Sequence, residues 1–391
     1  MTVYGTRPEA IKVAPVVKAL EASDSFDSVV VVTGQHREML DQVNEIFEIT
    51  PDFDLDIMSH GQTLTQIFAR VMAQLDPILA EVQPDAVVVQ GDTSTSTAAA
   101  LAAFYRQIPV VHLEAGLRSG DIMSPFPEEA NRKITSQIAS LHLAPTLRSL
   151  ANLVAEGVRL EDIVVTGNTV IDALYMAVER RTPFTDPAVA RVAAADRQIV
   201  LVTTHRRENW GNAMEGVGRA LARIARRFPD VEIVLPVHRN PVVREAVLPH
   251  LDGLPNVTVT EPLAYGEFTH LLSLSTLILT DSGGLQEEAP SLGKPVLVMR
   301  DNTERPEAVE AGTARLIGTD ENRIVAEAGR LLTSDAAYAA MAQAINPYGD
   351  GQSAARTLEA TARMLAPALT DLLPDFDLTG ELTAAAVEGG A

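Results

Sequence analysis

The sequence predicts an α/β protein made of two domains, each built on a parallel β-sheet. Its 391 residues exceed what one ordinary hydrophobic core holds and suit two domains of average size. Short runs of β-branched residues alternate with longer amphipathic stretches, which is the pattern of βαβ units. The runs are almost continuously apolar, as expected for parallel strands that are covered on both faces.

The strands and helices can be predicted in order along the chain. In the first half, an apolar stub before Gly5 predicts the first strand, and further strands are predicted at 29–34, 86–92, 110–116, 141–145 and 163–168, with helices over 62–82 and 93–107. The second half repeats the pattern, with strands at 199–205, 231–238, 257–262, 277–284 and 295–299 and helices over 212–227 and 321–332. The domain boundary is expected within 168–196, where "GNTVIDAL" begins a helix and a Pro-rich, charged stretch follows. A last helix is predicted at 351–366, and the acidic tail 367–391 is expected to be disordered.

The composition excludes several classes of protein. A formal net charge of −21 argues against nucleic acid or an anionic membrane as a partner. No apolar run approaches the roughly 18 residues of a membrane span, and no signal-peptide pattern opens the chain. The absence of cysteine excludes disulfides, thiolate zinc sites and cysteine nucleophiles, and it fits a cytoplasmic protein. Any anionic ligand must therefore be held by a local concentration of positive charge.

Most predicted strands end in polar or reactive residues, as in "TGQHR", "QGDTS", "LEAGLR", "TTHRREN", "PVHRN" and "TDSGG". In open α/β sheets, ligands bind outside the carboxyl ends of the strands. A simpler interpretation is that the strands end where polar loops begin. The repetition of such ends in both halves favours a ligand cleft between the two domains.

Two strand ends concentrate positive charge. In "GTRPEAIK", a helix N-terminus follows a strand, and Arg7 and Lys12 add cations beside it. The alternative is a capped helix with solvated cations. In "THRREN", His205 can donate to a phosphate or transfer a proton, with Arg206 beside it; a structural histidine is the alternative.

A glycine pair follows another strand in "TDSGGLQEEAPSLGKP". The backbone amides of residues 282–284 can hold a diphosphate there. Glu288 lies one helical turn further, where its carboxylate can accept the two hydroxyls of a ribose. The alternative is a glycine turn with an ordinary surface glutamate.

Three carboxylates are candidates for acid–base chemistry. Asp92 and Glu114 follow apolar strands, and Glu128 precedes Arg132 by one turn. Asp92 has an alternative role as a helix cap. Glu114 stands at the inner end of an apolar strand, which is costly unless the carboxylate is used or paired. Several carboxylates near bound phosphate indicate acid–base work on a neutral part of the ligand.

Cofactor and metal motifs do not occur. No G-x-G-x-x-G is present, which counts against a nicotinamide cofactor, and no H-E-x-x-H or clustered ligand spacing indicates a metal. The D-x-D spacings in 52–56 and 375–377 do not follow convincing strands, so solvated loops are predicted there. We expect no cofactor and no metal.

A series of motifs spans residues 3–365: "GTRPEAIK", "TGQHREML", "QGDTSTSTAAALAAF", "HLEAGLRS", "PFPEEANR", "VTGNTVIDAL", "HRREN", "LPVHRNP" and "TDSGGLQEEAPSLGKPVLVMRDNTERPEAVEAGT". Together they resemble the non-hydrolysing UDP-N-acetylglucosamine 2-epimerases. The resemblance implies a GT-B-like fold, two Rossmann-type domains facing across a cleft, and a homodimer. It implies an N-terminal domain of 1–168 plus a crossing helix 351–366, and a C-terminal UDP-binding domain of 169–350. Family members have a longer first strand, so either the true start lies upstream or this strand is short.

The resemblance also implies an activity, the reversible epimerisation of UDP-GlcNAc to UDP-ManNAc at C2, which feeds cell-surface polysaccharide precursors. In the family, UDP is eliminated to leave a glycal and is added back after a proton returns to the opposite face of C2. The positions that match catalytic residues are Asp92, Glu114, Glu128 and His205, with base, acid and orienting roles unassigned. Those that match substrate-binding residues are Arg7, Lys12, Arg132, Leu263, Phe268, Ser282, Gly283, Gly284, Glu288 and Arg305. Some members bind a second UDP-GlcNAc as an allosteric activator, at positions that match Gln35, Arg70, Arg206 and His238.

Other activities stay open at this stage. The chain could epimerise a related UDP-amido sugar such as a diacetamido uronate, or hydrolyse its substrate to free ManNAc and UDP. It could also be a GT-B glycosyltransferase, which would require an acceptor. A non-catalytic nucleotide-sugar sensor is a further alternative, but it would not need the three carboxylates.

Overall fold

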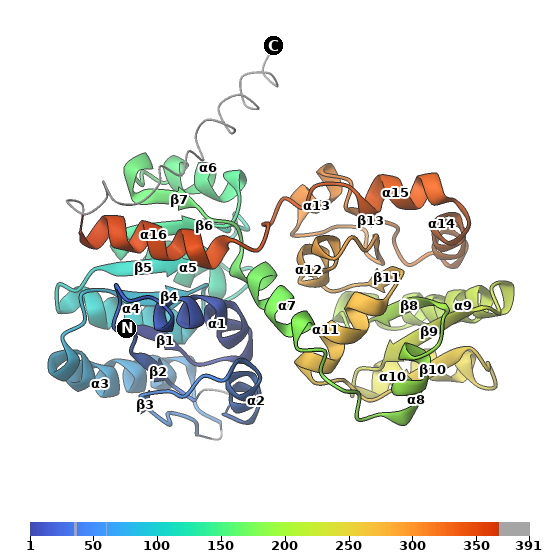
Figure 1. Ribbon diagram of the computed structural model, residues 1–391, viewed down its shortest axis with the longest axis horizontal. Coiled ribbons are helices and arrows are strands. Elements are labelled where there is room, and N and C mark those ends of the chain that lie inside the picture. The colour runs from blue at the N-terminus through green and yellow to red at the C-terminus, as the bar shows by residue number, and fades with distance from the viewer. Residues whose placement is uncertain (35–36, 60, 367–391) are drawn as a thin grey trace, which may run out of the picture. The chain divides into compact units, whose positions relative to one another are not determined.

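The computed structural model describes residues 1–34, 37–59 and 61–366 (Figure 1). Gln35 and the tail 367–391, including the D-x-D spacing at 375–377, lie outside the described residues. The chain forms two compact units, one of Met1–Ala173 together with the segment that begins at Gly351, and one of Leu174–Asp350. In the described part of the chain, no helix has both the length and the apolar character needed to cross a membrane.

The first unit contains a seven-stranded, fully parallel sheet with the order β3-β2-β1-β4-β5-β6-β7. Its strands are β1 (Thr2–Tyr4), β2 (Val30–Val32), β3 (Phe53–Asp54), β4 (Val87–Gln90), β5 (Val110–Leu113), β6 (Leu141–Ala144) and β7 (Ile163–Val165). Its helices are α1 (Arg7–Glu21), α2 (Arg37–Phe47), α3 (Leu64–Val82), α4 (Ser94–Tyr105), α5 (Glu128–Ile138), α6 (Leu147–Ala155), the start of α7 (Thr169–Glu179), and α16 (Ser353–Leu365), with a 3₁₀ turn at Leu160–Asp162. Helix α16, the last helix of the described chain, packs against α1 and approaches β6 (Figure 1).

The second unit contains a six-stranded parallel sheet with the order β10-β9-β8-β11-β12-β13. Its strands are β8 (Gln198–Thr203), β9 (Val231–Pro236), β10 (Val257–Thr260), β11 (Leu277–Thr280), β12 (Val296–Val298) and β13 (Ala314–Leu316). Its remaining helices are α8 (Pro187–Ala193), α9 (Asn212–Arg227), α10 (Pro241–Leu251), α11 (Tyr265–Leu274), α12 (Leu285–Ser291), α13 (Pro306–Glu310), α14 (Glu321–Thr333) and α15 (Asp335–Ala342), with a 3₁₀ turn at Arg207–Asn209.

The burial of both sheet faces is clear in β8. Val200 and Val202 pack into the core with α9, whereas Ile199 and Leu201 pack into a separate core on the opposite face. The near-continuous apolar runs therefore reflect strands covered on both sides, as predicted. Two short edge strands were not predicted. The loop expected at 52–56 is wrong at Phe53–Asp54, which pairs with β2 as β3, and β13 closes the other sheet.

Each sheet reverses its strand order once, between β1 and β4 in the first unit and between β8 and β11 in the second. At such a switch point, the loops that leave neighbouring strands diverge to opposite faces and open a crevice for ligands. "GTRPEAIK" follows β1 and "GDTS" follows β4. "THRREN" follows β8 and "DSGG" follows β11. Four of the motifs selected from the sequence thus leave the strands that flank the two switch points, and Glu114 follows the next strand, β5.

Candidate active site

Glu114 follows β5 with a left-handed backbone conformation, φ 59°, and its side chain is only 7% exposed. Lys12 Nζ donates to both carboxylate oxygens at 2.6 Å. Asn168 Nδ2 donates to Oε1 at 3.2 Å, and Gln90 Nε2 donates to Oε2. The buried carboxylate of Glu114 is therefore paired with a cation. The alternative for Lys12, a cation solvated at the surface of a capped helix, is wrong. Arg7, the first residue of α1, is half-buried.

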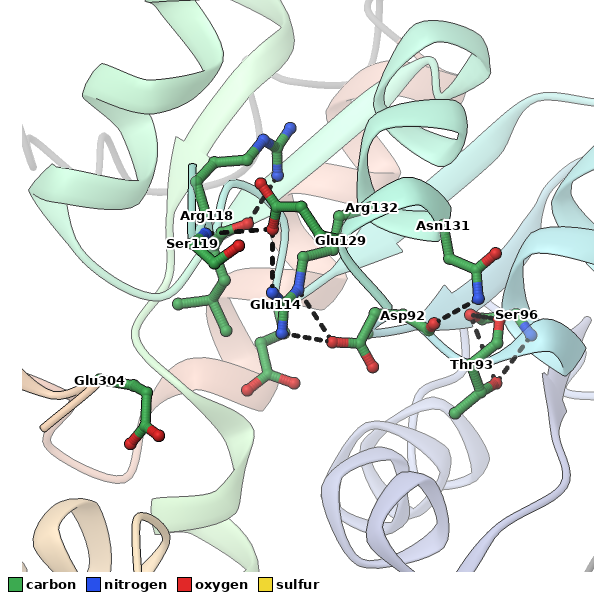
Figure 2. A network of polar contacts seen from close by, with 12 residues as sticks. Asp92, Thr93, Ser96, Glu114, Arg118, Ser119, Glu129, Asn131, Arg132 and Glu304 are labelled. Carbon is green, nitrogen blue, oxygen red and sulfur yellow. Dashed lines mark hydrogen bonds and ion pairs between the residues drawn. The ribbon is translucent and has the colours of Figure 1, made fainter. Parts of the chain in front are cut away.

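Asp92 lies in the turn after β4 and is bound by Arg132 from α5 (Figure 2). Arg132 Nε donates to Asp92 Oδ2 at 2.9 Å, and Arg132 Nη1 donates to Glu129 Oε2 at 3.1 Å. The capping role considered for Asp92 is wrong, because Thr93 is the N-cap of α4 and accepts the N–H of Ser96 at 3.0 Å. The Asp92 carboxylate is thus available to a ligand while a guanidinium holds it.

Glu129, rather than the predicted Glu128, is the carboxylate buried next to Arg132. Its side chain is inaccessible to solvent and accepts the backbone N–H groups of Ser119 at 3.1 Å and Gly120 at 3.4 Å. Burial alone would raise the pKa of Glu129, but these bonds and Arg132 hold it below its ordinary value. Glu128 begins α5 and is partly exposed, and within the described ranges its carboxylate makes no hydrogen bond or ion pair.

The turn that carries Asp92 is held from three sides. His112 Nε2 donates to the carbonyl of Gly91 at 2.7 Å, and Asn131 Nδ2 donates to the carbonyl of Asp92 at 2.8 Å. Thr93 Oγ1 donates at 2.7 Å to Glu9, a buried carboxylate of α1. Burial lowers the pKa of His112 to about 4, so its ring is neutral at pH 7. Asp92 is consequently presented by a rigid turn.

Glu9 also orders the turn after β1. Its Oε2 accepts the N–H groups of Gly5 at 3.1 Å and Thr6 at 2.8 Å, which is the capping-box arrangement at the start of α1. Gly5 itself is required by close packing, because a Cβ there would lie 1.9 Å from Thr33 Oγ1. This turn places Arg7 and Lys12 in the first two turns of α1.

In the second unit, the SGG turn after β11 differs in one respect from the prediction. The N–H of Ser282 is taken by Thr280 Oγ1 at 2.9 Å, so it is not free for a diphosphate. In the described structure, the N–H groups of Gly283 and Gly284 have no intramolecular acceptor. The Arg206 guanidinium lies next to this turn, since a Cβ on Gly283 would be in van der Waals contact with Arg206 Nη2 at 3.6 Å.

The remaining predicted nucleotide residues lie around the same end of the second sheet. Glu288 is partly buried in α12, and Phe268 is partly buried in α11, with Leu263 just before that helix. Arg305 is the N-cap of α13 and forms an ion pair with Glu287.

The predicted activator residues have separate surroundings. Arg70 in α3 donates to the carbonyl of Ile57 at 3.0 Å and to Gln62 Oε1 at 3.1 Å. Both acceptors lie in the segment that precedes α3, so Arg70 fixes this segment to the helix. Arg206 lies 3.8 Å from Glu304, and the His238 ring stacks on His205 with centroids 5.8 Å apart. The ends of β8 and β9 thus bring Arg206 and His238 to His205, whereas Arg70 belongs to the other unit.

Sequence reasoning missed three buried carboxylates: Glu9, Glu129 and Asp281. A signal existed for Glu9, because Thr6 and Glu9 have the T-x-x-E spacing of a capping box. A signal also existed for Asp281, which directly precedes the SGG turn and, like Glu114, stands at the end of an apolar strand. Nothing in the sequence distinguishes Glu129 from Glu128. Over the residues that the structure covers, no group of three or more His, Asp or Glu side chains is placed to hold a metal ion.

Comparison with known proteins identifies the family. A family model described as UDP-N-acetylglucosamine 2-epimerase matches residues 18–362. The chain belongs to this family. The UDP-N-acetylglucosamine 2-epimerase of Escherichia coli K12 is 55% identical over 366 residues, which cover 92% of this chain and 97% of that protein. The resemblance seen in the sequence motifs is confirmed, and the chain is an epimerase, an isomerase.

Solved structures of epimerases in this family share the fold. The Neisseria meningitidis UDP-GlcNAc 2-epimerase, solved with UDP-GlcNAc bound, aligns with a TM-score of 0.80 at 44% identity, covering 93% of this chain and 99% of that one. The Methanocaldococcus jannaschii enzyme, solved in complex with UDP-GlcNAc and UDP, aligns with a TM-score of 0.72 at 33% identity, covering 92% and 98%. The predicted GT-B-like class with two Rossmann-type units is thereby confirmed.

Proposed function

We propose that this epimerase interconverts UDP-GlcNAc and UDP-ManNAc by eliminating UDP to a glycal and adding it back. The substrate is supported by the names of the relatives and by the ligands in the Neisseria and Methanocaldococcus structures. The observation that carries the chemistry is the cluster of carboxylates at the first switch point, where Glu114 is paired with Lys12 and Asp92 with Arg132.

The mechanism follows from the weak acidity of the C2 hydrogen beside an acetamido group. Breaking the C1–O bond expels UDP while a carboxylate removes the C2 proton, which leaves a neutral glycal. Return of a proton to the opposite face of C2 and attack of UDP at C1 complete the inversion. Carboxylates must therefore exchange protons on both faces, and cations must stabilise the departing diphosphate.

The ion pairs suggest how the carboxylates divide this work. Asp92 and Glu114 each pair with a cation that fixes the position of the carboxylate, and both are proposed to accept the C2 proton or to orient the sugar. Glu128 has no such partner within the described ranges, and we propose that it exchanges a proton with the sugar on the other face of C2. Lys12, Arg7 and His205 are proposed to face the diphosphate.

The second unit is proposed to hold the nucleotide. Gly283 and Gly284 retain two N–H groups that a phosphate oxygen can accept, and Glu288 is one helical turn further for the ribose. Arg132, Leu263, Phe268, Ser282 and Arg305 are the remaining proposed substrate contacts. Because Ser282 already donates its N–H to Thr280, its hydroxyl is the group left for a ligand.

Solvent deuterium exchange at C2 tests the acid–base role. We expect wild-type protein to incorporate deuterium at C2 of UDP-GlcNAc, and Glu114→Gln to abolish the incorporation while still binding UDP. The matched control is Glu161→Gln, which changes a glutamate whose side chain is 70% exposed, and it should exchange at the wild-type rate. Retained exchange in Glu114→Gln would refute the role.

Product analysis tests the substrate and the reaction. NMR of the reaction mixture should show intact UDP-ManNAc, whereas a hydrolysing enzyme would yield free ManNAc and UDP. A panel of UDP-amido sugars that differ at C3 and C6 tests the alternative substrate, and faster turnover of a diacetamido uronate would replace the assignment.

An allosteric site for a second UDP-GlcNAc is proposed at Gln35, Arg70, Arg206 and His238. The test uses UDP-ManNAc as substrate. Activation is supported if the rate depends sigmoidally on the UDP-ManNAc concentration and this dependence becomes hyperbolic when UDP-GlcNAc is added. A hyperbolic curve that UDP-GlcNAc leaves unchanged contradicts it.

A homodimer is proposed on the aromatic surface of α4. Phe104 is 49% exposed and Tyr105 is 68% exposed, beside a groove of about 530 Å³ that Ile108 and Ile138 also line. Sedimentation should give a dimer for the wild type and a monomer for Tyr105→Glu, and a wild-type monomer at micromolar concentration would contradict the proposal.

We also propose that the enzyme acts in the cytoplasm, where it supplies polysaccharide precursors. Cell fractionation and loss of ManNAc-containing polysaccharide in a deletion strain test these two points.

A further inference from the structure

Asp281 is a fully buried carboxylate at the carboxyl end of β11. It accepts the backbone N–H groups of His205 and Arg206, each at 2.9 Å, and the hydroxyl of Thr204 at 3.0 Å. Asn209 Nδ2 donates to it at 3.3 Å. Burial alone would raise the pKa of Asp281, but the hydrogen bonds from His205 and Arg206 hold it below its ordinary value, so the group is an anion.

The same carboxylate also faces the imidazole of His205. Nδ1 of His205 lies 3.2 Å from Oδ1 of Asp281. An ionised carboxylate only accepts hydrogen bonds, so a hydrogen bond across this contact requires the proton on Nδ1. The His205 side chain is 41% exposed, whereas Asp281 is inaccessible, and in the described structure Nε2 has no hydrogen-bond partner.

We propose that Asp281 is a positioning residue that fixes neutral His205 as the Nδ1–H tautomer and leaves Nε2 for the ligand. Nε2 then accepts a hydrogen bond from the ligand, and it donates one to a phosphate oxygen after taking a proton from solvent. In both states the Nδ1–H bond to Asp281 is kept, so the ring does not turn when its charge changes. Only the contact with a phosphate rests on the proposed function; the tautomer does not.

The neighbouring ring makes the assignment specific to His205. His238 stacks on His205 at an interplanar angle of 26°, and its own Nδ1 accepts the N–H of Asn240 at 3.2 Å. Neutral His238 therefore carries its proton on Nε2. Two adjacent imidazoles are thus expected to have opposite tautomers, which gives the experiment an internal reference.

The first experiment uses ligand-free wild-type protein labelled with ¹⁵N-histidine. Two-bond ¹H–¹⁵N correlation spectra distinguish the tautomers of each neutral ring, and the signals of His205 and His238 are identified by their loss in His205→Gln and His238→Gln. We expect Nδ1–H for His205 and Nε2–H for His238. An Nε2–H form, or a mixture, at His205 would overturn the proposal.

The second experiment compares Asp281→Asn with Thr204→Val, which removes one bond to Asp281 without touching His205. Asp281→Asn should lower kcat by about a hundredfold or more, the contribution typical of a positioned proton-transferring group, and change KM less. It should also lose the Nδ1–H tautomer, and Thr204→Val should keep it. If Asp281→Asn does not fold, the wild-type spectrum still decides.

A double variant separates positioning from an independent role. Because Asp281 acts through His205, adding Asp281→Asn to His205→Gln should cost no further activity. Losses that multiply would overturn the proposal. If His205→Gln leaves C2 exchange unchanged although the tautomer is as expected, the proposed catalytic role of His205 fails and the positioning stands.

Discussion

Two buried histidines should make the first unit sensitive to acid. His112 in β5 and His142 in β6 are register partners on neighbouring strands, 0% and 2% exposed. Burial lowers the pKa of each from 6.5 to about 4, and each ring has an Nδ1 without a partner in the described structure. Protonation of either ring therefore places an uncompensated charge inside the sheet.

The sign and size of the effect follow from linkage. The folded-state pKa lies below the unfolded value, so the unfolded chain binds protons first as the pH falls. The stabilisation is complete above pH 6.5 and is lost progressively as the pH falls towards about 4. Each histidine contributes about 3 kcal/mol over the full range, of which about 2 kcal/mol is lost by pH 5.

Hydrogen exchange of peptides from β5 and β6 measures the effect within the first unit. Between pH 7.5 and pH 5, the opening free energy of these strands should fall by about 4 kcal/mol in wild type and by about 2 kcal/mol in His142→Phe. Peptides from β8 and β11 in the same samples report the other unit as a control. An identical pH dependence in wild type and His142→Phe would refute the reasoning.

Three substitutions in the first unit test its packing, its ion pairs and its helix caps. Gly5→Ala should lower the free energy of unfolding in urea by about 2 kcal/mol, because the new Cβ overlaps Thr33 Oγ1. An unchanged midpoint of urea unfolding would show that the turn shifts to accommodate the methyl group. Arg118→Met should cost about 1–2 kcal/mol at pH 7, because Arg118 is the main reason that the pKa of Glu156 is about 2. Wild type should lose this contribution as the pH falls from 4.5 towards 2, and Arg118→Met should show a smaller pH dependence that comes from Lys133, which also donates to Glu156. Thr93→Ala should lower stability by about 1 kcal/mol and Thr93→Ser should restore it; equal losses would exclude the cap.

Most of the fold was predictable because parallel strands buried on both faces leave a continuous apolar run in the sequence. The run "AVVVQGD" became β4, and helix 212–227 was predicted with the bounds that α9 has. The edge strands β3 and β13 lack this signal. Phe53–Asp54 has one partner strand and alternates a half-buried with an exposed residue, so its pairing depends on β2 rather than on its own composition.

The site was predictable where chemistry coincides with a strand end. Glu114 stands out because it directly follows the strand "VVHL", and Asp92 because it follows the apolar run "VVV" by three residues. The burial of Glu129 and the partial exposure of Glu128 could not be predicted, because adjacent helical residues differ only in the direction of their side chains, which is set by the packing of α5 against α4. Only the three-dimensional structure shows which of the two faces Arg132.

The two switch points use the same device, and it explains how a chain with a net charge of −21 can face an anionic ligand. In the first unit, Glu9 accepts the N–H groups of the turn that leads to Arg7 and Lys12. In the second, Asp281 accepts those of His205 and Arg206. In each case the carboxyl group is buried and accepts main-chain N–H groups of the loop, whereas the cationic or imidazole side chains lie on the same loop and are partly exposed. Acidic side chains are thus used to shape the loops, and at the proposed phosphate site the nearest exposed side chains of these loops are cationic or imidazole groups.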